Sequence, residues 1–167
     1  RGCVAAQPQT ASSASTRCRA RIMPEISRNR ARAIEWDCAQ VLTRFFNAFD
    51  EWHYDDMARM FAPDGVWHRA GKALQGAAIM EALNARSRTQ SVRHVVTNIS
   101  IDVADDTSAG FTLYVTAYMH DSGEKPTSLP TIRAPYLLLT VPGRMVRVAE
   151  DWKIATMSMN REFEFER

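Results

Sequence analysis

The sequence predicts an α+β fold, in which N-terminal helices pack on one face of a curved, mainly antiparallel sheet. In the first half of the chain, apolar residues recur three and four positions apart, which is typical of amphipathic helices. The second half changes to segments rich in Val, Ile, Thr, Leu and Tyr, separated by short turn signals. Helices followed by closely linked strands favour a helix layer against an antiparallel sheet.

Three helices are expected in the first half. The first follows Ser27, a typical N-cap residue, and carries a broad apolar stripe. A short second helix within 55–65 is stopped by Pro63, and a brief strand is expected over 66–71. The third helix is expected within 76–88. The stripe of the first helix consists of Ile34, Cys38, Val41, Leu42, Phe45 and Phe49.

Four strands are expected in the second half, at 92–103, 111–120, 132–141 and 144–159. The turn signals that break these segments are ADDTSAG, DSGEKPTSLP, PG and AED. Alternation along the first strand predicts one apolar face, formed by Val95, Ile99, Ile101 and Val103. The opposite face is formed by Val92, His94, Val96 and Asn98.

The second strand divides in the same way into an apolar face and a mixed face. Tyr114 and Tyr118 lie on the mixed face, together with Thr112, Thr116 and His120. A mixed face that helices still cover is typical of a ligand pocket. We therefore expect a pocket for a small hydrophobic molecule. The residues expected to bind it are Phe49, Tyr54, Trp67, Val96, Asn98, Tyr114, Tyr118 and Met157.

Composition indicates a single domain. The chain has 167 residues and a formal charge of +2, and residues 1–22 hold four arginines and no acid. Without that segment the balance is slightly acidic, so we expect neither a nucleic-acid partner nor a membrane partner. The expected organisation is a disordered or non-native extension over 1–26, one domain over 27–162 and a tail over 163–167.

The three cysteines indicate a reducing, cytoplasmic location. Their number is odd, and they form neither a CxxC pair nor a disulfide framework. No apolar run is long enough to span a membrane. Cys38 lies in the first helix, where a small buried hydrophobe is a more common role for cysteine than a nucleophile.

Asp50 and His94 are the candidate catalytic pair. Asp50 follows Phe49 at the end of the first helix, on the edge of the apolar stripe. If the two side chains meet, the carboxylate fixes the tautomer of the imidazole, and the second ring nitrogen is free as a general base. Taken singly, each has an ordinary structural alternative: a solvated cap at a helix end for Asp50, and a satisfied histidine for His94.

A metal site is not expected. The segment DEWHYDD, residues 50–56, contains acids and a histidine, but their spacing matches no defined metal site. Adjacent acids at the start of a helix complement its dipole. No cofactor-binding motif is present in the sequence either.

Four segments together resemble the nuclear-transport-factor-2-like superfamily, and its SnoaL-like branch in particular. They are LTRFFNAFDEWHYDDMARMFAPDGVWHRAG, LQGAAIMEAL, SVRHVVTNISIDVADDTSAGFTLYVTAY and EDWKI, and they span roughly residues 30–160 in the family's order. The resemblance implies a cone-shaped domain, in which helices close one side of a strongly curved sheet around an apolar pocket.

The resemblance also implies a chemistry. Scytalone dehydratases and hexachlorocyclohexane dehydrochlorinases carry an Asp and a His where this chain has Asp50 and His94. Carried over, His94 is the base and Asp50 its partner in a cofactor-independent elimination or isomerisation of a small, cyclic substrate. The chain departs from these relatives at two positions. Phe49 replaces a tyrosine of scytalone dehydratase, and Met157 lies near the place of an arginine, with Arg161 further on.

Two alternatives stay open. The chain can instead be a ligand-binding protein without catalysis, or a structural subunit like the β subunit of ring-hydroxylating dioxygenases. Both departures favour these alternatives, whereas Asp50 and His94 favour an enzyme. A homo-oligomer, dimer or trimer, is also expected. Its interface is expected on an outer sheet face that includes Leu137, Leu139 and Val141.

Overall fold

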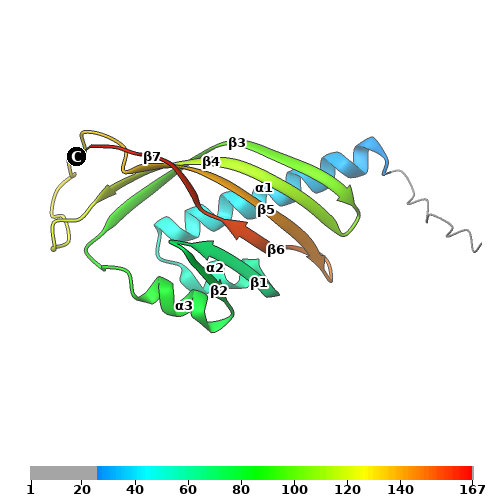
Figure 1. The fold of residues 1–167 in the computed structure, drawn as a ribbon, viewed down its shortest axis with the longest axis horizontal. Coiled ribbons are helices and arrows are strands. Elements are labelled where there is room, and N and C mark those ends of the chain that lie inside the picture. The colour runs from blue at the N-terminus through cyan, green and yellow to red at the C-terminus, as the bar shows by residue number, and fades with distance from the viewer. Residues whose placement is uncertain (1–25, 167) are drawn as a thin grey trace, which may run out of the picture.

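A computed structural model describes residues 26–166. Three helices lie against one strongly curved sheet, and the first runs along the length of the sheet (Figure 1). The helices are α1 (Arg28–Asp50), α2 (Tyr54–Met60) and α3 (Ala77–Asn84). The strands are β1 (Phe61–Arg69), β2 (Lys72–Gln75), β3 (Ser91–Asp105), β4 (Ser108–His120), β5 (Leu137–Val148), β6 (Asp151–Ser158) and β7 (Asn160–Glu164). The predicted α+β class is confirmed.

The sheet is mixed, but all of its pairings except one are antiparallel. Its order is β2-β1-β6-β5-β4-β3, with β7 paired to β5. The exception is the parallel pair of β1 and β6. β3 and β4 form a long hairpin, which continues into β5. The long strands of this meander and α1 enclose most of the core.

The first helix forms as its sequence predicts. The hydroxyl of Ser27 accepts a hydrogen bond from the backbone N–H of Arg30 at 3.3 Å, which is an N-cap. The apolar stripe is buried against the sheet and α2, and its last turn places Phe49 and Asp50 beside β3. Its buried residues are Ile34, Cys38, Leu42, Phe45, Phe46, Ala48 and Phe49.

The second helix is shorter than predicted, because β1 begins at Phe61 and includes Pro63. The register between β1 and β6 is irregular between Phe61 and Val66, which accommodates a proline within the strand. β2 and β7 are additional short strands that the sequence patterns do not indicate.

A β-bulge at Asn98 interrupts the alternation along β3. Asn98 has a φ of 52°, and the register with β4 shifts beside it. Before the bulge His94 faces inward and Val95 outward, whereas beyond it Ile101 packs against the core. The prediction of one continuous apolar face is therefore wrong. Val95 and Ile99 are exposed, while Ile101 and Val103 are half-buried against the core.

Strand pairing also shows that the apolar face of β4, and not the expected mixed face, lies on the same side of the sheet as His94. His94 lies opposite Ala117, and directly paired residues point to the same side of a sheet. The inner face of β4 is thus the apolar one, with Val115, Ala117 and Met119. Tyr114, which is 41% exposed, is on the outer face, as is Tyr118.

The PG segment does not end a strand. β5 continues through Pro142 and Gly143, and the reversal occurs at Ala149, which has a φ of 53°. On one edge β5 pairs with β7 up to Thr140 and with β6 from Gly143 onward. Pro142 therefore lies where the ladder on that edge changes neighbour, and its missing N–H interrupts no continuous pairing there.

The three residues predicted to form an oligomer interface on the outer sheet face do not lie on that face. Leu137, Leu139 and Val141 are buried in the core of the single chain, because the inner side of β5 carries them. An oligomer stays a prediction. The expected extension over 1–26 lies, except for Ile26, outside the described residues. Within residues 26–166, no helix has both the length and the apolar character needed to cross a membrane.

A glycine in the middle of β5 provides a test of how closely the sheet is packed. A Cβ on Gly143 would lie 2.2 Å from the carbonyl oxygen of Thr156 and 2.3 Å from Cζ of Phe111. Gly143→Ala should therefore lower the free energy of unfolding by about 1–3 kcal/mol. Gly110→Ala is the matched control, because its nearest contact would be 3.8 Å away. Urea unfolding of both variants measures the difference, and equal stability would contradict the close packing at Gly143.

Candidate active site

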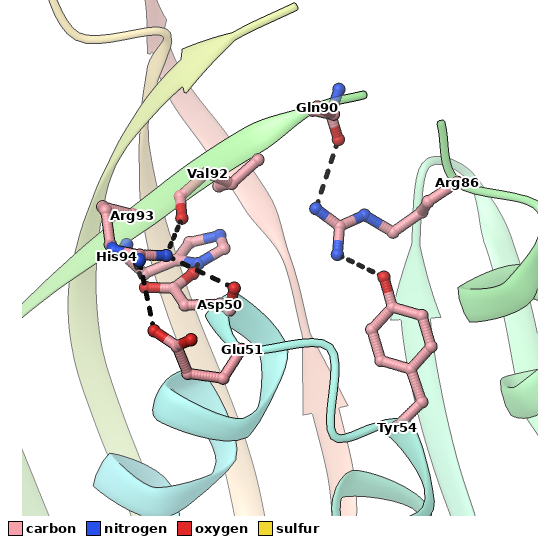
Figure 2. Close-up of polar contacts among 8 residues, drawn as sticks. All are labelled: Asp50, Glu51, Tyr54, Arg86, Gln90, Val92, Arg93 and His94. Carbon is pink, nitrogen blue, oxygen red and sulfur yellow. Dashed lines mark hydrogen bonds and ion pairs between the residues drawn. The ribbon is translucent and has the colours of Figure 1, made fainter. Parts of the chain in front are cut away.

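Asp50 and His94 meet where the end of α1 reaches β3. Oδ1 of Asp50 is 2.5 Å from Nδ1 of His94, and Oδ2 accepts a hydrogen bond from the backbone N–H of His94 at 2.8 Å (Figure 2). Their side chains are only 9% and 8% exposed. Both carboxylate oxygens are thus committed to one residue, which fixes the ring relative to the helix.

A second layer of polar contacts holds the same junction from the solvent side. The guanidinium of Arg93 donates to the carbonyl oxygens of Asp50 and Val92, and it forms an ion pair of 3.1 Å with Glu51. Arg93 therefore satisfies a carbonyl at the C-terminus of α1, where helix carbonyls lack intrahelical partners. Because the Arg93–Glu51 pair is exposed, it positions the helix end without entering the cavity.

The contact with Asp50 dictates what the imidazole can do. An ionised carboxylate can only accept hydrogen bonds, so Nδ1 of His94 carries the proton in this contact. In the neutral ring Nε2 is then the free acceptor, and Figure 2 shows it directed away from Asp50. Phe49 stacks on the ring, with centroids 4.9 Å apart and planes at 13°. This orientation leaves Nε2 able to accept a proton.

His94 borders a cavity of about 300 Å³, a size suited to a small organic molecule. One wall is apolar and comes mainly from the inner faces of the meander. Its residues are Val92, Ala117, Met119, Leu137, Leu139 and Met159. The other wall is polar. It carries Arg69, Arg86, Gln90 and Arg161.

The expectation of an apolar pocket therefore needs correction. Arg69 lies two residues after the buried Trp67 in β1, and this parity could have indicated that it points inward. Arg86 follows α3 in a loop, where no periodic pattern could have placed it. Arg161, noted in the sequence as a late arginine, does border the cavity, although its side chain is 55% exposed.

Arg86 is held in position by neighbours on two elements. Its guanidinium donates to the hydroxyl of Tyr54 at 2.7 Å and to the side-chain carbonyl of Gln90 at 3.2 Å (Figure 2). It also lies over the rings of Phe49 and Trp52, 4.3 and 4.8 Å from their centroids. Burial raises the pKa of Tyr54, and the positive charge of Arg86 partly opposes this rise.

Two of the eight expected substrate-binding residues lie at this site. Phe49 borders the cavity, and Tyr54 contacts the cavity residue Arg86 through its hydroxyl. Trp67 is fully buried behind Phe49, with ring centroids 5.9 Å apart. Val96 shares the inner side of β3 with His94 but does not border the cavity.

The other four residues lie elsewhere. Asn98 is exposed at the bulge, and Tyr114 and Tyr118 are on the outer face of β4. Met157 is fully buried in β6 and does not border the cavity. Asn98, Tyr114 and Tyr118 lie away from the cavity because the prediction assumed unbroken alternation in β3 and paired His94 with the wrong face of β4.

Among residues 26–166, no three His, Cys, Asp or Glu side chains are grouped closely enough to hold a metal ion. Part of the DEWHYDD segment begins α2, where Asp55 and Asp56 occupy the first turn, and Asp56 also contacts Arg59. This placement agrees with a role of these acids in complementing the helix dipole.

The fold and the cavity define a class of protein, the nuclear-transport-factor-2-like domains. The family model described as a SnoaL-like domain matches residues 30–158, and the chain belongs to this family. No curated protein sequence gives a significant match.

Solved structures share the fold at low sequence identity. A protein assigned as a scytalone dehydratase from Novosphingobium aromaticivorans is 16% identical, with a TM-score of 0.68 over 83% of this chain and 92% of its own. A type 2 hexachlorocyclohexane dehydrochlorinase (LinA) is 11% identical, with the same TM-score and coverages. A protein from Catenulispora acidiphila, solved in complex with S-DNPA, is 22% identical, with a TM-score of 0.64 over 78% and 95%.

Cys38 gives a test of the burial of the apolar side of α1. Burial, together with the negative charge of Asp37, raises the pKa of its thiol to about 12. Because only the thiolate reacts, iodoacetamide should leave Cys38 unmodified in the folded protein at pH 8 to about 9. In urea-unfolded protein, the control, Cys38 should be alkylated. Peptide mass spectrometry measures both, and rapid labelling of Cys38 in the folded protein would contradict its burial.

Proposed function

We propose that the chain is a cofactor-independent lyase or isomerase, which removes a proton from carbon in a small, cyclic substrate with a hydrophobic body. The contact between Asp50 and His94 at the cavity wall carries this proposal. Buried carboxylate–imidazole pairs orient a base and stabilise the imidazolium that forms when it accepts a proton. His94 is the proposed base, and Asp50 is its positioning partner.

The proposed reaction needs only groups of the chain and the substrate. Nε2 of His94 accepts the proton of the C–H bond, and the electron pair of that bond forms a new double bond. In an elimination, the leaving group departs with its own bonding pair. In an isomerisation, the imidazolium returns the proton to another carbon. Asp50 stays ionised and stabilises the positive charge on the ring.

The leaving group requires a partner that Phe49 cannot supply. The side chain of Phe49 has no hydroxyl, and its ring stacks on His94 instead. Tyr54 and Arg86 offer the nearest alternative, since the phenol accepts from the guanidinium and keeps its own proton for donation. Arg86 itself can stabilise negative charge that develops on a departing oxygen or halide.

The similar structures support this reaction class by their names. A dehydratase and a dehydrochlorinase both eliminate, one releasing water and the other hydrogen chloride. With identities of 16% and 11%, the likeness concerns the fold, so the activity of this chain rests on its own dyad.

Base-promoted ring opening of nitrobenzisoxazole provides a direct assay. A base removes the C–H proton of the isoxazole ring, its electron pair completes the nitrile as the N–O bond breaks, and a coloured cyanonitrophenolate forms. The protein should accelerate this reaction above the buffer rate, and His94→Gln or Asp50→Asn should lower kcat/KM by about 100-fold or more. Absorbance of the phenolate measures the rate.

Glu51→Gln is the matched control. It removes a neighbouring carboxylate whose partner is Arg93 rather than His94, and its side chain is 60% exposed. Its rate should stay close to that of the unmodified protein. Equal rates for Asp50→Asn and Glu51→Gln would contradict a role for the dyad, and a binding protein without catalysis would then be the better reading.

A further inference from the structure

The cavity contains positive charge that the protein itself does not neutralise. Arg69 and Arg86 both border it. Among residues 26–166, no carboxylate oxygen lies within 4.0 Å of either guanidinium, although seven other ion pairs form within that distance. Among the described residues, no Asp or Glu borders the cavity, and the nearby Asp50 is hydrogen-bonded to His94 through both carboxylate oxygens.

Two like charges in one partly enclosed site are unfavourable without a counterion. Burial lowers the pKa of Arg69, and the charge of Arg86 lowers it further. Both groups nevertheless stay protonated at neutral pH, because guanidinium is far too weak an acid to lose its proton there. Arg69 lies over the rings of Phe49 and Trp67 at 5.6 and 5.1 Å, but a ring quadrupole offers attraction without neutralising the charge.

The positive charge and the proposed base share one neighbour and one cavity. Phe49 is the common neighbour: the His94 ring is 4.9 Å from its centroid, Cζ of Arg86 is 4.3 Å away and Cζ of Arg69 is 5.6 Å away. All four side chains border one cavity of about 300 Å³. One small molecule can therefore contact a guanidinium and Nε2 of His94 at the same time.

The remaining wall restricts which anion fits. Val92, Ala117, Met119, Leu137 and Leu139 offer only apolar side chains to the cavity. Two N–H groups of Arg86 are already engaged by Tyr54 and Gln90. The polar side chains that border the cavity are those of Arg69, Arg86, Gln90, His94, Tyr136 and Arg161, and the rest of the lining is largely apolar. This combination suits a planar carboxylate with an apolar body better than inorganic phosphate, which has no apolar part to bury there.

We propose that the cavity binds an organic carboxylate, with its carboxylate between Arg69 and Arg86 and its apolar body against the meander. An organic carboxylate would be the substrate class of the proposed reaction. That it is a substrate rests on the proposed function, whereas its binding in the cavity does not. The carboxylate anchors the molecule at one end and leaves its ring or chain at His94, where a C–H bond can be attacked.

Cinnamate and its neutral isostere cinnamamide are the probes. By isothermal titration calorimetry in low salt, the full chain should bind cinnamate at least about tenfold more tightly than cinnamamide. Arg69→Met and Arg86→Met should each remove most of that difference. Arg88→Met is the matched control, since Arg88 lies over Trp52 and Tyr54 but does not border the cavity, and it should keep the difference.

Two further measurements keep the result interpretable. Methyl signals of Met119 and Met159 should shift with cinnamate, which locates binding in this cavity. Arg86→Lys retains the charge but not the planar fork, so it should bind cinnamate with intermediate affinity even where Arg86→Met unfolds.

Several outcomes would overturn the inference. They are equal affinity for the two probes, no cinnamate binding at millimolar concentration, or displacement of cinnamate by inorganic phosphate at equal concentration. The test is separate from the catalytic one. The Asp50→Asn variant should still bind cinnamate. A protein that opens nitrobenzisoxazole but does not bind cinnamate would contradict the carboxylate proposal and leave the catalytic proposal standing. The reverse result would refute only the catalytic proposal.

Discussion

The carboxylate of Asp50 is the constraint on which the rest of the site depends. A buried carboxylate requires hydrogen bonds, and here both oxygens obtain them from a single residue on β3. The end of α1 is thereby fixed against the strand, in a position that Arg93 reinforces from outside. With the helix end fixed, Phe49 stacks on His94 and forms part of the cavity wall. The same polar contact thus fixes the end of α1 in the fold and orients the residues of the site.

The parts of the fold that the sequence could predict are those with uninterrupted local periodicity. The stripe from Ile34 to Phe49 determines which side of α1 is buried, and it places Asp50 at the edge of that side. The strand that carries His94 was also predictable, together with its hairpin partner. The contact between the two residues followed from the family resemblance rather than from spacing, because residues 44 positions apart share no local pattern.

The failures have physical causes at particular residues. Asn98 adopts a positive φ, and the bulge there shifts the alternation that a sequence pattern assumes to be regular. The polar wall was missed for another reason. Arg69, Arg86 and Arg161 come from a strand, a loop after a helix and the last strand, and only the curvature of the sheet brings them to one cavity. Surface arginines are so common that none of the three is distinctive in the sequence.

The structural role of Asp50 can be separated from its chemical role, because a carboxamide in its place keeps one of the two accepting oxygens. In asparagine, the side-chain oxygen can still accept from the backbone N–H of His94, so the helix end keeps its anchor. The amide nitrogen, however, donates to Nδ1, and the ring proton must then reside on Nε2, the atom directed away from position 50. The shape of the site survives, while the free lone pair that would accept a substrate proton is lost. The carboxylate is thus required for the tautomer that the proposed base needs, and a neutral amide meets most of what the fold requires.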